Sequence, residues 1–237
     1  MARVGIVGGG AFGTALACVV RRSGHEVILW AREPDVAAAI NRDAANPVFL
    51  PGIALAPGIA ATNELAAAAK GADFMLLAPP AQHMRAVTGE LRAHLARGAP
   101  VVTCSKGVER GTCALMSQVI AETLPGTPVA VLSGPSFAHD IALDSPVGVT
   151  LACADRGIGE RLAQAIGTPR FRTYLSDDVT GALIGMNLTY DGWLVTATEH
   201  GQVVLVSRDL DEHHVISLPG SEAAEAYSEA VAAEGRS

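Results

Sequence analysis

Short apolar runs alternate with longer segments of helical spacing along residues 1–186. The apolar runs, bounded by Gly, Pro, Ser or Asn, predict strands at residues 3–8, 26–30, 74–78, 101–105, 129–133, 147–152 and 170–174. The helical spacing predicts helices at residues 14–22, 35–42, 62–70, 82–96, 115–123 and 158–166, with NPVFLPG as a loop. Strands and helices that alternate in this way indicate an α/β fold with a doubly wound, mainly parallel sheet.

The pattern changes at about Asn187, where strict alternation replaces the helical spacing. The segment TYDGWLVTATEHGQVVLVSRDLDEHHVISLPG, with a turn at His200-Gly201, is typical of an antiparallel β-hairpin or meander. Ser221 is placed to cap a short helix after it. We therefore expect an α/β domain over residues 1–186 and a strand-rich segment over residues 187–237.

Composition and charge narrow the classes of protein. Hydrophobic residues make up 49% of the chain and charged residues 17%, which supplies a sizeable core. The net charge of -7 argues against a protein that coats nucleic acid. No apolar run is long enough to span a membrane and the start of the chain does not resemble a signal peptide. We expect a cytoplasmic protein, and the sequence is compatible with a homo-oligomer.

Cysteine and histidine spacing indicates neither a metal site nor a redox site. The cysteines lie far apart, without a C-x-x-C pair, and we expect buried small hydrophobic residues at Cys18, Cys104, Cys113 and Cys153. His213 and His214 have no third ligand nearby, so we expect exposed turn residues there.

The first predicted strand is followed by a glycine-rich segment, GGGAFG at residues 8–13, which opens the first predicted helix. In that context the G-x-G-x-x-G pattern is the fingerprint of a dinucleotide-binding, Rossmann-type domain. Gly8 permits the tight turn, Gly10 lets the backbone approach a pyrophosphate, and Gly13 lets the helix pack close to the strand. The helix N-terminus then faces the negative charge. A purely structural glycine turn is the alternative interpretation.

The end of the second predicted strand carries the residues expected to choose between NAD and NADP. An NAD-binding domain usually has an acidic residue there for the ribose, whereas this chain has Arg32 followed by Glu33. Arg32 can pair with a 2'-phosphate, Glu33 can take the ribose instead, and both can be merely solvated. We favour NADP because of Arg32, with NAD as the alternative cofactor.

Two later segments follow strands at the sheet edge where ligands bind in α/β proteins. Ser105-Lys106-Gly107 places one of only two lysines in the chain there, where its ammonium can hold a substrate phosphate or alcohol oxygen. A surface lysine beside Glu109 is the alternative. SGPSFA, residues 133–138, offers hydroxyls and close backbone to the same edge, or is simply a Pro-Gly turn.

Together, VGIVGGGAFGTALA, INRDAANPVFLPG, CSKG and LSGPSFA resemble the cofactor-binding domain of bacterial NAD(P)-dependent glycerol-3-phosphate dehydrogenase, in order from Arg3 to about Asp178. The resemblance implies an oxidoreductase that transfers hydride between NAD(P)H and a small phosphorylated substrate, dihydroxyacetone phosphate or sn-glycerol 3-phosphate, for phospholipid synthesis. It implies cofactor contacts at Gly8, Gly10, Ala11, Phe12, Gly13, Arg32, Lys106 and Ala138. It implies substrate contacts at Lys106, Gly134 and Ser136.

The chain departs from the family after SDDVTGALIG. The family continues there with a glycine-rich helix whose lysine handles the proton, and with a helical substrate domain, whereas this chain has no lysine after Lys106. We therefore expect a truncated family member without the catalytic lysine. A gene fusion, a frameshift and an assembly artefact each produce this pattern. The alternative functions are a non-catalytic dinucleotide-binding protein and an interaction module that uses the C-terminal strands.

Overall fold

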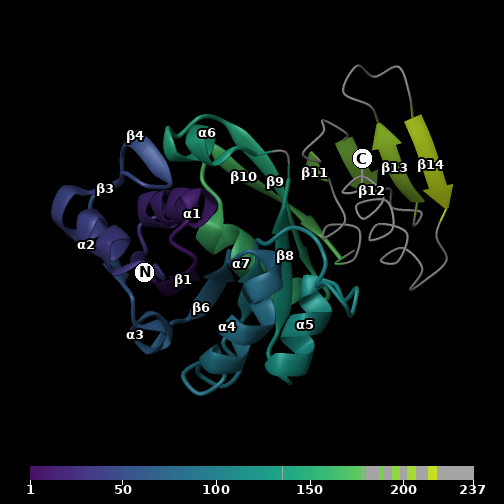
Figure 1. Cartoon of the computed structure of the whole chain (residues 1–237), viewed down its shortest axis with the longest axis horizontal. Helices are drawn as coiled ribbons and strands as arrows, with labels where there is room; N and C mark the ends of the chain where they lie inside the picture. Colours follow the sequence, from purple (N-terminus) through teal and green to yellow (C-terminus); the bar gives the residue numbers. More distant parts are fainter. Residues whose placement is uncertain are drawn as a thin grey trace.

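The fold is built around one large β-sheet (Figure 1). The computed structural model describes residues 1–134, 136–177 and 179, together with the backbone of four strands between residues 187 and 217. The strands of the large sheet are β1 (Arg3–Val7), β2 (Glu26–Trp30), β5 (Ile59–Thr62), β6 (Phe74–Leu77), β7 (Val101–Thr103), β8 (Val129–Ser133), β9 (Val147–Cys153) and β10 (Phe171–Ser176). Their order is β10-β9-β8-β7-β6-β1-β2-β5. All neighbours are parallel except β8 and β9, so the predicted doubly wound, mainly parallel sheet is confirmed.

Helices cover both faces of this sheet. They are α1 (Ala11–Arg22), α2 (Pro34–Asp43), α3 (Leu65–Ala69), α4 (Met84–Leu91), preceded by the 3-10 turn η1 (Ala81–His83), α5 (Met116–Thr123), α6 (Ala138–Ala142) and α7 (Arg156–Ile166). Buried side chains of α1, α2, α6 and α7 form one hydrophobic core with the sheet, and those of α3, α4 and α5 form a second core. Within the described part of the chain, no helix combines the length and the apolar character needed to cross a membrane.

β6 shows why the central strands are apolar along their whole length. Its residues are all buried, and successive side chains enter opposite cores. Phe74 and Leu76 pack with the α1 side, whereas Met75 and Leu77 pack with the side of α4 and α5. Because both faces of the sheet are covered, the strand has no position that suits a polar side chain.

The stretch around Thr62 folds differently from the prediction. The sequence predicts a helix over residues 62–70, but α3 spans only Leu65–Ala69, and β5, which the pattern did not predict, occupies Ile59–Thr62. Thr62 pairs with Trp30, and its carbonyl oxygen accepts a hydrogen bond of 2.9 Å from the Ala31 amide. Pairing with the edge of β2 therefore overrides the helix propensity of the Ala-rich segment.

The NPVFLPG segment also contains structure where a loop was predicted. β3 (Ala45–Asn46) and β4 (Leu50–Ala54) pair antiparallel in a separate two-stranded sheet. Leu50 and Ile53 are buried in the same core as α1, so this small sheet is anchored against the domain. A strand of two residues is too short to show a periodicity, which is why the sequence pattern missed it.

The C-terminal segment contributes four described strands, which are β11 (Asn187–Leu188), β12 (Leu194–Ala197), β13 (Gln202–Val206) and β14 (His213–Ser217). They pair antiparallel in chain order, so the predicted meander is confirmed. The predicted turn at His213 and His214 is wrong, because both residues pair with β13 within β14 and strand pairing overrides their polar character. The predicted turn at His200-Gly201 and the predicted helix after Ser221 lie outside the described residues, and the division at residues 186 and 187 stays a prediction.

The cysteines are free thiols. Cys18, Cys104 and Cys153 are buried, as predicted. Cys113 is only partly buried, so the predicted burial is wrong for this residue. Its φ is positive, at 55°, and its amide donates to the Glu109 carbonyl oxygen at 2.9 Å. Three of the thiols therefore act as small core residues, and the fourth belongs to the loop that follows β7.

Candidate functional site

The order of the strands reverses at β1. The chain runs from β1 through β2 to β5 on one side, and then returns to place β6 on the other side of β1. The Gly8 amide donates to the Trp30 carbonyl oxygen at 3.0 Å, and the Ala78 amide donates to the Val7 carbonyl oxygen at 2.8 Å, so the ends of the three strands are held together. In open α/β sheets ligands bind in the crevice outside such a switch point.

The glycine-rich turn lies at this switch point, and the structure shows why Gly8 and Gly13 are glycines. Gly8 has a φ of +119°, a conformation that side chains rarely adopt, and a Cβ atom there would lie 2.6 Å from the Ala78 carbonyl oxygen. A Cβ atom on Gly13 would overlap with the carbonyl oxygen of Gly8. A Cβ atom on Gly10 would have no neighbour within 4 Å, so this position is open. The turn is therefore closed on the protein side and open at Gly10.

A cleft of about 610 Å³ lies in front of the turn. It collects residues from the turn, from the ends of β2, β6 and β7, from the β3–β4 segment and from the start of α4. Its lining residues are Gly8, Gly9, Gly10, Ala11, Phe12, Gly13, Trp30, Arg32, Glu33, Phe49, Ala78, Pro79, Pro80, His83, Ala86, Val87, Cys104, Ser105 and Lys106. The structure thus brings the predicted glycine turn, Arg32 and Lys106 into one cleft.

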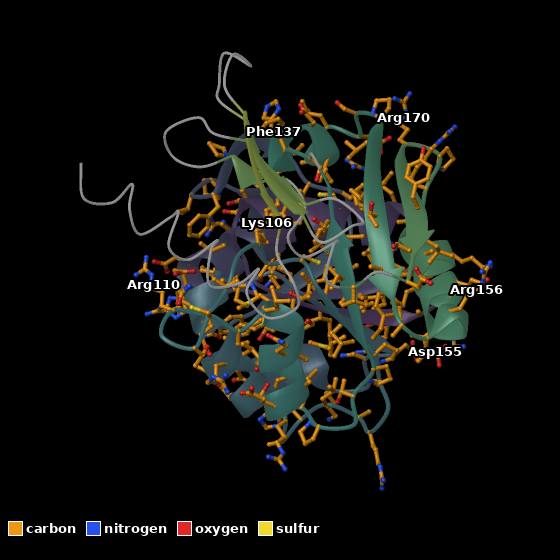
Figure 2. The ribbon with its side chains drawn as sticks, turned by 90° about the vertical axis from the view of Figure 1, so that its right-hand side faces the viewer. Lys106, Arg110, Phe137, Asp155, Arg156 and Arg170 are labelled. Carbon is orange, nitrogen blue, oxygen red and sulfur yellow. The ribbon has the colours of Figure 1, made fainter. Side chains whose placement is uncertain are left out.

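Lys106 is the cation at the β7 side of this cleft. It is exposed at the rim, yet enough protein surrounds its ammonium that burial lowers the pKa of Lys106 below its usual value. No ion pair joins it to any residue that the structure describes. In the view of Figure 2, Lys106 lies toward the middle of the molecule, whereas the exposed cations Arg110, Arg156 and Arg170 lie near its outline. The cleft therefore holds an ammonium that is available to an anionic ligand.

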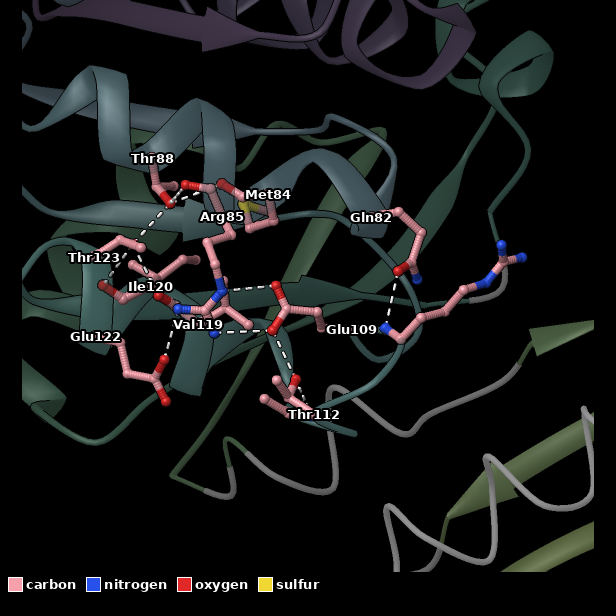
Figure 3. Close-up of polar contacts among 12 residues, drawn as sticks. Gln82, Met84, Arg85, Thr88, Glu109, Thr112, Val119, Ile120, Glu122 and Thr123 are labelled. Carbon is pink, nitrogen blue, oxygen red and sulfur yellow. Dashed lines mark hydrogen bonds and ion pairs between the residues drawn. The ribbon is translucent and has the colours of Figure 1, made fainter.

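Glu109, which lies three residues after Lys106, forms an ion pair with Arg85 (Figure 3). Arg85 Nε and Nη2 each donate to a carboxylate oxygen of Glu109 at 2.8 Å, and Arg85 Nη1 lies 2.7 Å from Glu122 Oε2. Thr112 Oγ1 donates to Glu109 Oε2 at 2.7 Å. The Arg85 guanidinium, followed by the Thr112 hydroxyl, lowers the pKa of Glu109 to about 2. Lys106 is therefore an exposed lysine near Glu109 without an ion pair between the two, and its role in binding stays a prediction.

Hydrogen bonds from Gln82 also hold the loop that carries Lys106. Gln82 Nε2 donates to the Val108 carbonyl oxygen at 2.8 Å. Gln82 Oε1 accepts from the Arg110 amide at 2.9 Å (Figure 3). Gln82 lies in η1, directly before α4, which also presents Ala86 and Val87 to the cleft. One short segment of helix therefore lines the cleft and secures the loop after β7.

Arg32 and Glu33 both lie at the mouth of the cleft after β2. Both side chains are exposed, and neither forms an ion pair with a residue that the structure describes. The Glu33 side chain makes no capping hydrogen bond although the residue begins α2. Arg32 has the charge to pair with a 2'-phosphate and Glu33 has the acceptors for a ribose hydroxyl, so both NADP and NAD remain candidate cofactors.

Gly134, Ser136 and Ala138 follow β8 and do not line this cleft. A Cβ atom on Gly134 would lie 3.1 Å from the Gly148 carbonyl oxygen, which gives this glycine a packing reason beside β9. The Ser136 amide donates to the Gly134 carbonyl oxygen at 2.9 Å in a tight turn. Because β7 and β8 are parallel neighbours, this turn and Lys106 lie at the same edge of the sheet. A role for these residues in binding stays a prediction.

Several lining residues escaped the sequence analysis. Phe49 comes from the NPVFLPG segment, Trp30 ends β2, and His83 lies in η1. Ala78, Pro79 and Pro80 follow β6 beside the glycine turn. The Pro-Pro pair after an apolar run was the available signal for a loop at the ligand edge of the sheet. Phe49 and His83 carry no such signal, because only the folded chain brings them to the cleft.

Comparison with known proteins points to one family. The sequence model described as "NAD-dependent glycerol-3-phosphate dehydrogenase N-terminus" matches residues 3–158. Glycerol-3-phosphate dehydrogenase (NAD(P)+) of Paramagnetospirillum magneticum is 54% identical over 185 residues, which cover 78% of this chain and 67% of that protein. The protein of the same name from Caulobacter vibrioides is 54% identical over 183 residues, covering 77% of this chain and 55% of that protein.

A solved structure agrees with the sequence relatives. The crystal structure of glycerol-3-phosphate dehydrogenase from Coxiella burnetii matches with a TM-score of 0.73 at 30% identity, covering 77% of this chain and 56% of that one. This chain therefore spans between 55% and 67% of the length of the proteins it matches here.

The Arg85–Glu109 pair predicts a defined acid sensitivity. Since the pKa of Glu109 is lowered from 4.5 to about 2 on folding, its contribution to stability is complete above pH 4.5 and is lost as the pH falls toward 2. The free energy of unfolding of wild type should exceed that of Glu109→Gln at neutral pH, and the difference should shrink across this window. Urea denaturation at a series of pH values measures it.

Glu160→Gln is the control, because Glu160 forms an exposed i,i+4 pair with Arg156 at 3.0 Å on α7. This variant should show no comparable pH-dependent difference from wild type. A difference for Glu109→Gln that stays constant from neutral pH to pH 2 would contradict the role given to the carboxylate.

Proposed function

The chain belongs to the family of NAD-dependent glycerol-3-phosphate dehydrogenases, and we propose that the cleft at its switch point holds the nicotinamide dinucleotide for that family's reaction. The observation that carries the proposal is the glycine turn, which is closed on the protein side and open at Gly10. A pyrophosphate needs close approach to backbone amides, and a side chain at Gly10 would stand in its way.

The start of α1 suits an anionic ligand. Its first turn contains no acidic residue, and no side chain caps its N-terminus. The amides and the helix dipole are therefore free to face a phosphate. Arg32 adds a positive charge at the mouth of the cleft after β2, where it would meet the ribose end of the ligand. These residues fit a dinucleotide in shape and in charge.

The dinucleotide supplies the hydride when it is bound, and this chain's residues hold and surround it. Apolar residues such as Phe12, Phe49 and Val87 line the cleft and exclude water. Lys106 offers an ammonium at the end of β7 for the phosphate or the reacting oxygen of a small phosphorylated substrate. Gly134 and Ser136, at the same edge of the sheet, would meet that substrate in the complete site.

We propose that the complete activity is hydride transfer between NAD(P)H and dihydroxyacetone phosphate or sn-glycerol 3-phosphate. The relatives named above are glycerol-3-phosphate dehydrogenases, and the chain spans 67% and 55% of the length of the first two.

A second candidate is dinucleotide binding without turnover, which is favoured by the absence of any lysine after Lys106.

We propose that the protein is cytoplasmic and acts on a small phosphorylated substrate. The four cysteines of the described residues are free, which is the usual state of cysteine in the cytoplasm. Whether the chain forms homo-oligomers stays a prediction.

Gly10→Val tests the proposed dinucleotide site. The variant should fold, because nothing lies within 4 Å of the Cβ position at Gly10. The valine side chain should, however, occupy the place of the pyrophosphate. Loss of two or more charge-assisted hydrogen bonds should raise the Kd for NADPH and NADH by about 100-fold or more, measured by titration calorimetry. Gly89→Val, at an equally open position on α4 and outside the cleft, should leave both Kd values unchanged. Equal binding by Gly10→Val and wild type would remove the turn from the site.

Arg32→Ala tests the preference for NADPH. Loss of one charge-assisted contact typically costs about 1.5–3 kcal/mol, so NADPH should bind roughly 10-fold or more weakly while NADH is spared. The control is Arg42→Ala on α2, since Arg42 is exposed, pairs with Asp43 and does not line the cleft. A variant that loses affinity for both cofactors equally would give Arg32 a structural role and leave the preference unexplained.

Turnover tests the complete activity. A positioned acid or base typically contributes about 100- to 10,000-fold, and the lysine that serves the family has no counterpart after Lys106. We expect the 237-residue chain to oxidise NADPH with dihydroxyacetone phosphate more slowly than about 1 per second, in a spectrophotometric assay. The rate should rise when a relative's helical domain is added. Faster turnover by the chain alone would mean that another of its residues handles the proton.

A further inference from the structure

A buried asparagine links the β3–β4 segment to the glycine-rich turn. The Asn46 side chain is fully buried. Its Nδ2 donates to the Gly9 carbonyl oxygen at 2.9 Å and to Thr14 Oγ1 at 2.8 Å. Its Oδ1 accepts a hydrogen bond of 3.1 Å from the Phe49 amide. Because Gly9 offers an acceptor and Phe49 offers a donor, the carboxamide has only one orientation that satisfies both.

The bond to Gly9 constrains the peptide that borders the cleft. Thr14 Oγ1 also donates to the Gly9 carbonyl oxygen, at 3.4 Å, so two side chains hold this oxygen. A trans peptide unit is planar, and its C=O and N–H point in opposite directions. Holding the Gly9 carbonyl therefore sets the direction of the Gly10 amide. Gly10 lies in the cleft lining, at the position that is open toward a ligand.

Asn46 also holds one wall of the cleft. Phe49, whose amide is bonded to Asn46 Oδ1, lines the cleft and is 40% exposed. Thr14, the second partner of Nδ2, starts the hydrogen bonding of α1 through its amide, which donates to the Gly10 carbonyl oxygen at 3.0 Å. One carboxamide thus joins the turn, the first turn of α1 and the aromatic wall.

We propose that Asn46 is a positioning residue for dinucleotide binding, which orients the Gly9–Gly10 peptide so that the Gly10 amide is preorganised for the pyrophosphate. The proposal rests on the dinucleotide site proposed above. A peptide already held in place needs no ordering when the ligand arrives, so its hydrogen bond contributes in full to affinity. Asn46 itself acts through the backbone and does not need to touch the ligand.

Asn46→Asp tests the proposal, because it keeps the shape of the side chain and removes both N–H donors. The Kd for NADPH and NADH, measured by calorimetry at a temperature where circular dichroism shows the variant folded, should rise about tenfold or more for both. Thr14→Val removes the hydroxyl that bonds Asn46 and Gly9, and it should raise the Kd for both cofactors in the same way. Thr14→Ser keeps a hydroxyl and should retain the wild-type Kd.

Asn41→Asp is the matched control. Asn41 Nδ2 donates to the Ala61 carbonyl oxygen and Oδ1 accepts from the Ala61 amide, both at 2.8 Å, away from the cleft. This variant should lower the melting temperature without changing either Kd. An unchanged Kd in folded Asn46→Asp, or an equal loss of affinity in Asn41→Asp, would overturn the proposal. If Asn46→Asp does not fold, equal Kd values for Thr14→Val and Thr14→Ser would overturn it. Wild-type protein that binds neither cofactor would instead overturn the dinucleotide site.

Discussion

The close approach of α1 to β1 is the contact on which the rest of the structure depends. Only glycine at position 13 lets the helix start directly behind the strand, because a Cβ atom there would overlap with the Gly8 carbonyl oxygen. That start brings the helix N-terminus to the switch point between β2 and β6. The open position at Gly10 and a first helical turn without acidic residues follow from the same arrangement. The backbone of the turn and of the first turn of α1 thus forms a site suited to an anionic ligand even without a charged side chain.

The charged side chains near the cleft divide into paired and free groups. Arg85 forms ion pairs with both Glu109 and Glu122. This pairing removes Glu109 as a partner for Lys106, although the two residues share one loop. Burial lowers the pKa of Lys106, and none of the residues that the structure describes neutralises it. Separate pairing of the neighbouring charges therefore keeps one ammonium available at the ligand edge of the sheet.

Side chains from segments that are distant in the sequence hold the backbone of this site in place. Asn46 fixes the glycine turn from the side of β3, and Gln82 fixes the loop after β7 from η1. Both use a carboxamide, which can donate and accept at once and so can lock a backbone segment in one orientation. Neither residue needs to contact a ligand for its effect. The position of these two backbone segments is consequently set by contacts between segments that are distant in the sequence.

The sequence alone determined the elements whose signals are local. β2 and β8 have the predicted bounds, and the glycine spacing located the turn, because an apolar run and a G-x-G-x-x-G pattern are complete within a few neighbouring residues. Only the tertiary structure decided what depends on distant partners. β5 exists because β2 offers it an edge, and Asn46 acquires its role from Gly9, 37 residues away in the chain. A buried asparagine and an exposed one look alike in a sequence, since burial and hydrogen-bond partners are set by packing.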